Sequence, residues 1–299
     1  MKAALGAALA ELLRSPRYEV FPSSGIEDEV VEQLSNDVKV TVTSSPKRGI
    51  ETTLQLSAEL ARRGFEVVPH VSARLVKDEK HLQDILQGLH DVGVHDILVI
   101  GGDVEEPVGR FTSAFDLLTA MAELGHGLDQ IGIAGYPESH PFISDEMTIR
   151  AMSEKASLAT YIVSQLCFEP RTIDGWIAAV RERGVDLPIH VGIPGPVPRR
   201  KLVRISTRIG VGESARFLRK HGNVLARLLL RGSYGPGYII ERLAPHTGDA
   251  RNIGGFHIFT FNELERTERW RQQAIRRLGR PAAVPPSACS PPSRVSRRI

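Results

Sequence analysis

The sequence predicts an α/β fold, a (β/α)8 TIM barrel with an extra N-terminal helix and a helical insertion before the last strand. Three observations lead to this prediction. Short β-branched and apolar runs alternate with longer stretches of helical periodicity along most of the chain. About eight such units over roughly 250 residues match this barrel in number and length. No G-x-G-x-x-G follows an expected strand, which disfavours an open dinucleotide-binding sheet.

Residues 1–16 are expected to form an amphipathic helix outside the barrel. Their lysine, apolar run and small residues look like a secretion signal, but Glu11 and Arg14 interrupt the apolar run. No run reaches the ~20 apolar residues of a membrane span. Cys167, within an expected strand, and Cys289 indicate neither a disulfide framework nor a thiolate metal site. We therefore expect a cytoplasmic protein without a membrane partner.

Eight strands are expected from runs rich in β-branched and aromatic residues. They cover residues 18–21, 38–43, 65–71, 96–102, 130–136, 160–166, 187–193 and 256–261. Glycines stand a few residues before several of these strands, where helix C-caps usually lie. These glycines are Gly64, Gly93, Gly125 and Gly184.

The helices between the strands are expected to bury one apolar stripe each. The clearest stripes follow the i, i+3, i+4, i+7 spacing. They are Leu82, Ile85, Leu86, Leu89 and Val92; Ala114, Leu117, Leu118, Met121 and Leu124; and Ile173, Trp176, Ile177 and Val180. These stripes belong to the core and not to a functional site.

The end of the chain departs from the simple alternation. Residues 194–255 are too many for one crossover and predict two or three additional helices before the last strand. A final helix is expected within residues 262–279. Residues 280–299, rich in proline, serine and arginine, bury too little apolar surface to fold and are expected to be a disordered tail. The expected domains are thus the N-terminal helix, a catalytic barrel over residues 17–279, and this tail.

The charge of the chain argues against a nucleic-acid partner. The formal net charge is +3, but Arg280, Arg294, Arg297 and Arg298 lie in the tail, so the preceding residues carry a net charge of −1. Those residues show no stripe of clustered lysine and arginine such as a nucleic-acid groove presents. The expected partners are small molecules.

Polar side chains are expected at the carboxyl ends of the strands, where enzymes of this fold place their active sites. Burying many polar groups is unfavourable unless each is paired or used, so a ligand pocket explains them together. They are Glu19, Thr43, His70, Asp103, Tyr136, Glu138, His140, Gln165, His257 and Thr260.

Several of these residues also have a structural interpretation. Glu19 can pair with an arginine inside the barrel. Thr43 and Gln165 can be core polar groups whose hydrogen bonds are satisfied. Asp103, after two glycines, can cap its loop.

No metal site is expected among them. His70 and His140 are not at metal-ligand spacing. They also lack an obvious third partner in the sequence.

The order of these segments resembles that of a known family. They are "YEVFPSS", "VTVTSS", "VVPHVSA", "VIGGDVEEP", "GIAGYPESHP", "YIVSQLCFE", "HVGIPGPV" and "GFHIFTFNE". In sequence and spacing they resemble the methylenetetrahydrofolate reductase family from about residue 17 to about residue 273. The most specific parts are "YPESHP" and the glutamate before Phe-Pro.

The resemblance implies an activity and residue roles. The family is a (β/α)8 barrel that reduces 5,10-methylenetetrahydrofolate to 5-methyltetrahydrofolate with hydride from a nicotinamide, usually through bound FAD. By position, Glu19 matches the general acid, Asp103 the acid that holds the pterin, and Gln165 a folate-contacting glutamine. The residues that fall where the family contacts its flavin are Thr43, His70, Tyr136 and His140.

Elementary chemistry makes a glutamate suitable for this role. The methylene bridge accepts hydride only after its ring opens to an iminium, and this opening needs a proton on the departing nitrogen. Glu19 is flanked by Tyr18, Val20 and Phe21, and apolar surroundings favour the neutral acid. Glu19 is therefore expected to be a carboxylic acid kept protonated by its apolar strand.

The sequence departs from the family where the diphosphate of FAD is held. The usual arginine two residues before Asp103 is Gly101 here, and the usual basic pair after "YPESHP" is Glu154 and Lys155, with Ala151 at the place of an asparagine. Loss of one charge-assisted hydrogen bond costs about 1.5–3 kcal/mol. We therefore expect reduction by NADH or NADPH directly, without flavin.

Other activities stay open on the sequence. Retention of the flavin-contacting residues fits an ordinary FAD-dependent reductase, and the damaged cofactor site fits a non-catalytic folate-binding or regulatory barrel. Another barrel enzyme acting on a different one-carbon carrier is a third alternative. The family commonly has an aromatic residue in the insertion that stacks on the ligand, and here Ile205 and Ser206 stand near its place. Lys47 and Arg48, after the second strand, can contact phosphates or a polyglutamate tail, or can belong to a solvated loop. The sequence contains no signal that indicates the oligomeric state or the choice between NADH and NADPH.

Overall fold

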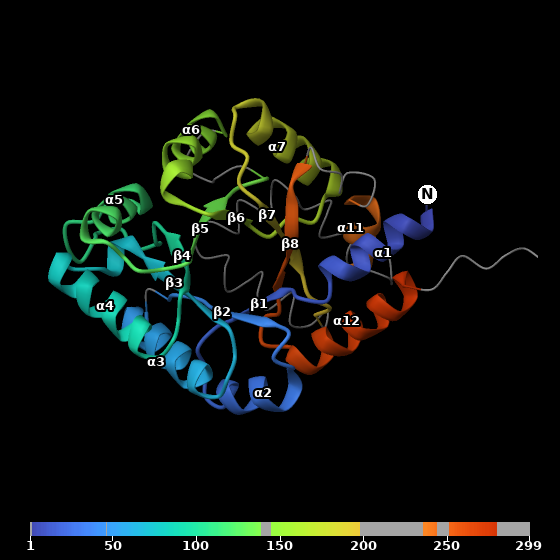
Figure 1. The fold of residues 1–299 in the computed structure, drawn as a ribbon, viewed down its shortest axis with the longest axis horizontal. Helices are drawn as coiled ribbons and strands as arrows, with labels where there is room; N and C mark the ends of the chain where they lie inside the picture. Colours follow the sequence, from blue (N-terminus) through green and yellow to red (C-terminus); the bar gives the residue numbers. More distant parts are fainter. Residues whose placement is uncertain (1, 46, 139–144, 198–235, 244–250, 280–299) are drawn as a thin grey trace, which may run out of the picture.

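Eight parallel strands close into a barrel in the computed structural model of this protein (Figure 1). The structure describes residues 2–45, 47–138, 145–197, 236–243 and 251–279. Strands pair in chain order, and β1 pairs with both β2 and β8, which closes the ring. They are β1 Arg17–Val20, β2 Lys39–Val42, β3 Val67–Ser72, β4 Asp96–Ile100, β5 Gln130–Gly135, β6 Tyr161–Ser164, β7 Ile189–Pro194 and β8 Ile253–Phe259. The predicted (β/α)8 barrel is confirmed.

Helices surround the barrel (Figure 1). They are α2 Ile26–Gln33, α3 Gly49–Arg62, α4 Glu79–Asp91, α5 Ala114–Leu124, α6 Asp145–Lys155, α7 Pro170–Glu182 and α12 Leu264–Leu278, with short 3-10 turns η1 Ala73–Leu75 and η2 Ala156–Leu158. The three predicted stripes lie on α4, α5 and α7, where Leu82, Leu117 and Ile173 are fully buried. Packing of these stripes on the strands therefore holds the outer layer in place.

The ends of the helices follow local signals in the sequence. Asp78 accepts a hydrogen bond from the main-chain N–H of His81 at the start of α4. Ser113 and Asp116 form a reciprocal capping box at the start of α5. The predicted capping glycines all have positive φ and end their helices as expected; they are Gly64, Gly93, Gly125 and Gly184.

The two faces of each strand meet different surroundings. In β1, Tyr18 and Val20 are fully buried in the large apolar core. Arg17 and Glu19 lie on the opposite face, because side chains alternate along a strand, and contact residues of β4, β3 and β8 inside the barrel. A separate small apolar cluster comprises Val68, Leu98, Tyr161 and Val163. The barrel interior is therefore partly apolar and partly polar.

A polar cluster fills the amino-terminal end of the barrel. Arg17 Nη1 donates to Asp96 Oδ2 at 3.0 Å, and the Tyr161 hydroxyl donates to Asp96 Oδ1 at 2.7 Å. The Arg17 guanidinium lies 4.1 Å from the centre of the Tyr161 ring, which packs edge-on against His190. The arginine inside the barrel is thus paired with Asp96 and not with Glu19.

The predicted N-terminal helix is present as α1 Lys2–Leu12, which lies beside α12 (Figure 1). Arg271 of α12 is fully buried and donates to the main-chain oxygens of Leu13, at 3.2 Å, and Arg14, at 2.6 Å. Its guanidinium also pairs with Glu268 at 2.8 Å. These partners satisfy a buried charge that would otherwise be unfavourable, and they tie α12 to the segment that follows α1.

Some predictions fall outside the described residues, namely most of the helical insertion, with Ile205 and Ser206, and the tail over residues 280–299. Within the insertion the structure describes α11 Gly237–Leu243. Strand ends also differ from the prediction. Strand β6 ends at Ser164, so Cys167 lies beyond the strand and not within it. No described helix is long and apolar enough to cross a membrane.

Candidate active site

The carboxyl ends of the parallel strands form one rim of the barrel, and the predicted site residues gather there. They are Glu19 in β1, Thr43 after β2, His70 in β3, Asp103 after β4, Tyr136 after β5 and Gln165 after β6. His140 lies outside the described residues. The six residues thus come from six successive strands of one ring.

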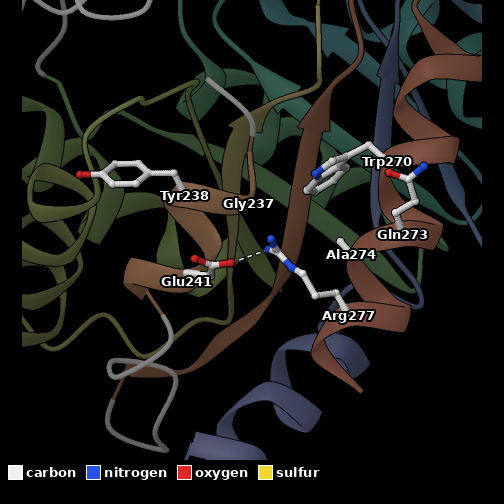
Figure 2. A pocket seen from close by; sticks show the side chains of 7 residues that line it. All are labelled: Gly237, Tyr238, Glu241, Trp270, Gln273, Ala274 and Arg277. Atoms are coloured by element: carbon white, nitrogen blue, oxygen red, sulfur yellow. Dashed lines mark hydrogen bonds and ion pairs between the residues drawn. The ribbon is translucent and has the colours of Figure 1, made fainter. Parts of the chain in front are cut away.

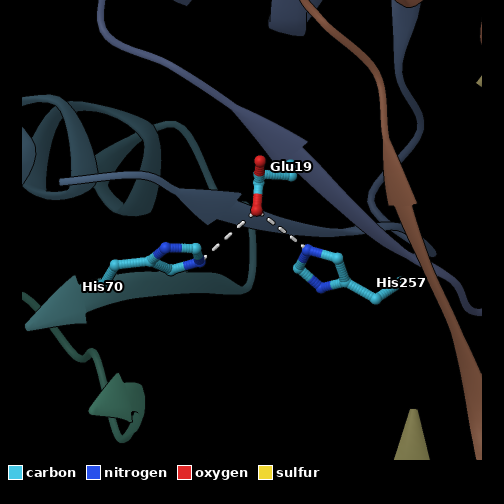
Figure 3. Close-up of side chains that lie close together, drawn as sticks. All are labelled: Glu19, His70 and His257. Carbon is cyan, nitrogen blue, oxygen red and sulfur yellow. Dashed lines mark hydrogen bonds and ion pairs between the residues drawn. The ribbon is translucent and has the colours of Figure 1, made fainter. Parts of the chain in front are cut away.

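Glu19 lies between two buried histidines (Figure 3). Its Oε2 atom is 3.1 Å from His257 Nε2 and 4.0 Å from His70 Nε2. The Glu19 side chain is 18% exposed, whereas those of His70 and His257 are 8% and 0% exposed. The carboxyl group is therefore accessible while its two neighbours are shielded.

These surroundings differ from the apolar environment expected for Glu19. Tyr18 and Val20 lie on the outer face of β1, and the Tyr18 hydroxyl donates to Glu268 at 3.1 Å. Phe21 follows the strand and is 43% exposed. Apolar neighbours in sequence therefore do not surround the carboxyl group, because adjacent strand residues point to opposite faces.

Hydrogen bonds fasten the main chain around Glu19 to the end of β8. Thr260 Oγ1 donates to the Glu19 main-chain oxygen at 2.5 Å. The Asn262 side chain accepts from the Phe21 N–H at 3.0 Å and donates to the Phe21 oxygen at 2.9 Å. Phe261 and Asn262 have positive φ angles of 52° and 56°. This uncommon turn is held by the contacts that position Glu19.

The His70 imidazole is expected to be neutral at physiological pH. Burial lowers the pKa of His70 to about 4, the Glu19 carboxylate opposes this shift, and His257 adds to it. A neutral imidazole keeps one bare ring nitrogen, which can accept a hydrogen bond or bind a cation.

Several buried polar atoms near Glu19 have no hydrogen-bond partner within the described part of the chain. They are His70 Nε2, His257 Nδ1 and Thr41 Oγ1. Thr41 is the register partner of Glu19 on β2. An unpaired buried polar group costs about 1–3 kcal/mol. Such atoms indicate that water or a ligand completes this region.

Asp103 lies on a loop that Arg74 fastens. The Arg74 side chain donates to the main-chain oxygens of Val104 and Thr112, both at 2.9 Å. Its main-chain N–H donates to the Gly101 oxygen at 3.0 Å, and its oxygen accepts from the Val108 N–H at 3.0 Å. Asp103 itself is exposed at the rim. One arginine thus sets the path of the segment that carries the carboxylate.

Gln165 and Thr43 have recorded main-chain partners. Gln165 is exposed, and its Oε1 accepts from the Leu166 N–H at 2.8 Å. The Thr43 oxygen accepts from Thr53 Oγ1 at 2.9 Å, and its N–H donates to the Val20 oxygen at 2.9 Å. These contacts fix both residues at the rim. They use the amide oxygen of Gln165 and the main-chain N–H and oxygen of Thr43.

Comparison with known protein families shows to which family the chain belongs. Residues 28–272 match the family model described as methylenetetrahydrofolate reductase. The chain belongs to the methylenetetrahydrofolate reductase family. The resemblance noted in the strand-end segments is thereby confirmed.

Individual relatives match over shorter stretches. Methylenetetrahydrofolate reductase 2 of Saccharomyces cerevisiae is 29% identical over 128 residues, which are 39% of this chain and 21% of that protein. Methylenetetrahydrofolate reductase 1 of Schizosaccharomyces pombe is 29% identical over 116 residues, 36% of this chain and 19% of that protein. The matched stretch therefore spans about a fifth of these relatives.

The likeness to solved structures is remote. A Yersinia pestis DHPS in complex with a pterine-sulfa conjugate superposes with a TM-score of 0.44 and 14% sequence identity, covering 90% of this chain and 94% of that chain. These values carry no information on activity.

The resemblance places Gly101 and Glu154 where the family holds the FAD diphosphate, and neither residue carries a cation. Glu154, at the place of a cation, accepts a hydrogen bond from Arg150 Nε at 3.1 Å. Burial lowers the pKa of Lys155, and the neighbouring Glu154 opposes this shift. A Cβ atom added at Gly101 would meet no atom within 4 Å, so close packing does not require glycine at this position.

Two cavities formed by described residues lie outside the barrel and away from Glu19. The larger, about 350 Å³, lies between α11 and α12 and is lined by Tyr238, Trp270 and the ion pair of Glu241 with Arg277 (Figure 2). The smaller, about 240 Å³, lies beside α5 and η2. Neither contains a residue predicted for the site.

Sequence reasoning missed Arg74 and Asn262, and it missed how His257 and Thr260 contact Glu19. His257 and Thr260 were expected at the rim, but nothing in the sequence paired them with Glu19, because β1 and β8 meet only when the barrel closes. Arg74 and Asn262 bond mainly to main-chain atoms, which leave no pattern in a sequence. The phrase "Phe-Asn" at residues 261–262 offered a weak turn signal.

Proposed function

We propose that this protein reduces 5,10-methylenetetrahydrofolate to 5-methyltetrahydrofolate with a reduced nicotinamide as hydride donor. One observation carries the proposal beyond family membership. Glu19 places a partly exposed carboxyl group at the catalytic rim of the barrel, held by His257 and by the Thr260 contact. A barrel that only bound folate would gain nothing from such a fastened acid.

In this proposal Glu19 delivers the proton that opens the ring. Its proton goes to the departing nitrogen, the carbon–nitrogen bond to that nitrogen breaks, and an iminium forms on the other nitrogen. Hydride addition to the iminium carbon then gives the methyl group. The proton on Glu19 must be replaced before the next turnover, and its exposed side provides access to solvent.

Asp103 and Gln165 are proposed to bind the pterin. An ionised Asp103 accepts hydrogen bonds from amino and ring N–H groups, while the amide of Gln165 can donate and accept. Both lie at the rim, after β4 and β6, with β5 between these two strands. Their exposure fits groups that exchange water for substrate.

We further propose that no flavin intervenes. Glu154 and Gly101 replace cations of the family, whereas Glu19, Asp103 and Gln165 persist. Loss of these cations beside an intact set of proton-donor and pterin residues supports hydride transfer directly from nicotinamide, since random decay would damage both sets.

The deciding experiment measures oxidation of NADH and of NADPH by the purified protein with methylenetetrahydrofolate and no added flavin. The proposal expects turnover and formation of methyltetrahydrofolate. Folate binding without oxidation would instead support a non-catalytic folate-binding barrel. Turnover only after addition of FAD would support an ordinary flavoenzyme, which retention of Thr43, His70 and Tyr136 favours.

A further inference from the structure

We propose that Glu19, His70 and His257 form a reversible binding site for a divalent cation of the zinc type, and that an occupied site stops turnover. The three side chains come from β1, β3 and β8 and converge inside the rim (Figure 3). One ligand atom of each lies within 4.8 Å of the others.

Two of the three ligand pairs approach the spacing found in a zinc site, and the third pair lies within 4.8 Å. With bonds of about 2.0–2.2 Å in a tetrahedral arrangement, ligand atoms lie roughly 3.3–3.6 Å apart. Glu19 Oε2 and His257 Nε2 are 3.1 Å apart, and Glu19 Oε2 and His70 Nε2 are 4.0 Å apart. A sub-ångström approach of the His70 ring to Glu19 therefore brings that pair into range.

The donor set suits a borderline divalent ion. Two imidazoles with one carboxylate bind Zn²⁺, Co²⁺ or Fe²⁺ and leave coordination positions open. His70 Nε2 is buried, lacks a hydrogen-bond partner among the described residues and points toward Glu19 in Figure 3. A cation would satisfy this nitrogen, which the proposed hydride chemistry leaves unused.

The surroundings indicate reversible binding. Metal-ligating histidines usually donate their second ring N–H to another group, but His257 Nδ1 is unpaired within the described part of the chain. Glu19 is partly exposed, so an ion can reach the site from the rim. A weakened outer shell with open access favours an exchangeable ion over a permanent one.

The effect on turnover rests on the proposed function. A cation bound to Glu19 Oε2 competes with the proton that the mechanism requires on this carboxyl group. Zinc is therefore expected to inhibit the reductase, and a chelator is expected to restore it.

Binding is tested on metal-free protein with Co²⁺, whose visible absorption reports coordination, and with Zn²⁺ by calorimetry. We expect one site per chain, weakened at least about tenfold in His70→Ala and His257→Ala, because loss of an outer partner alone costs 10–100-fold. His257→Gln keeps a polar side chain of similar size if the alanine variant does not fold. The matched control is His90→Ala. His90 is exposed, and the centre of its ring lies 5.6 Å from the centre of the His95 ring, away from the proposed site.

The outcomes separate this inference from the proposed function. Zinc binding that is lost in the site variants and kept in His90→Ala, with inhibition over the same concentration range, supports the inference. No binding, or binding unchanged in the site variants, overturns it even if the protein is an active reductase. Site-specific binding by a protein without reductase activity supports the cation site and overturns the proposed function.

Discussion

Glu19 uses its two carboxyl oxygens differently. Oε2 faces the buried imidazoles of His257 and His70, while the other oxygen points away from both rings (Figure 3). One oxygen therefore fixes the orientation of the group, and the other is available to a substrate. This division suits a proton donor, because positioning and reaction do not compete for one atom.

Replacing Glu19 by glutamine tests the proton donor. Glu19→Gln keeps shape and hydrogen-bonding capacity but cannot deliver a proton, so kcat is expected to fall on the order of 10²-fold or more. Folate affinity, measured by equilibrium titration, is expected to stay similar. The matched control is Glu105→Gln, an exposed carboxylate of the rim loop. Nearly intact turnover in Glu19→Gln would place the acid elsewhere.

Replacing Asp103 by asparagine tests pterin binding. The amide presents two N–H donors where the ionised carboxylate presents only acceptors, so contacts to pterin N–H groups are lost. Loss of a charged hydrogen bond of about 1.5–3 kcal/mol corresponds to a 10–100-fold weaker folate Kd. Calorimetry measures this value, and an unchanged Kd would refute the assigned role.

At the scale of elements, the loop between β4 and α5 depends on Arg74. Arg74→Ala removes two hydrogen bonds to main-chain oxygens and is expected to loosen residues 101–112. The KM for folate should rise on the order of tenfold, about 1.4 kcal/mol, with a smaller change in kcat. Arg74→Lys should rescue poorly, because one ammonium does not reproduce the planar fork.

Hydrogen exchange provides the structural readout for this variant. Amides of residues 101–112 should exchange faster in Arg74→Ala, while those of β4 stay protected. A raised KM with unchanged exchange would show that Arg74 acts on substrate directly and not through the loop.

Elements were predictable from sequence to the extent that their signals are local. Strand periodicity and capping residues such as Ser113 are local, and so the barrel and most helices were expected. Placement of Glu19 at the rim also followed from its strand. The contacts of Glu19 with His257 did not, because they arise only on closure of the ring. The environment of Glu19 was misjudged because flanking residues occupy the other face.

At the scale of the whole molecule, the polar cluster at the amino-terminal end makes stability depend on pH. Burial, with the charges of Arg17, His257 and Lys39, lowers the pKa of His190 well below its usual value near 6.5. Below about pH 6.5, His190 binds a proton in the unfolded chain but stays neutral in the folded chain. Stability is therefore expected to fall as pH drops below about 6.5.

His190→Gln tests this dependence by urea unfolding between about pH 7 and pH 5. The variant should lose less stability on acidification than the parent, because the titrating group is gone. His90→Gln, at an exposed position of α4, is the control and should keep the slope of the parent. Equal slopes in all three proteins would assign the acid sensitivity to other groups.

Whether the protein binds FAD is tested by the colour of the purified protein and by substitutions designed to raise its affinity for FAD. The purified protein is expected to be colourless, because Glu154 and Gly101 stand where cations would hold the FAD diphosphate. Gly101→Arg together with Glu154→Arg should raise FAD affinity, since space is open at Gly101 and each new charge-assisted bond contributes about 1.5–3 kcal/mol. Flavin fluorescence quenching measures this change. A yellow parent protein with stoichiometric FAD would contradict the direct transfer of hydride. It would indicate that main-chain N–H groups hold the diphosphate without arginine.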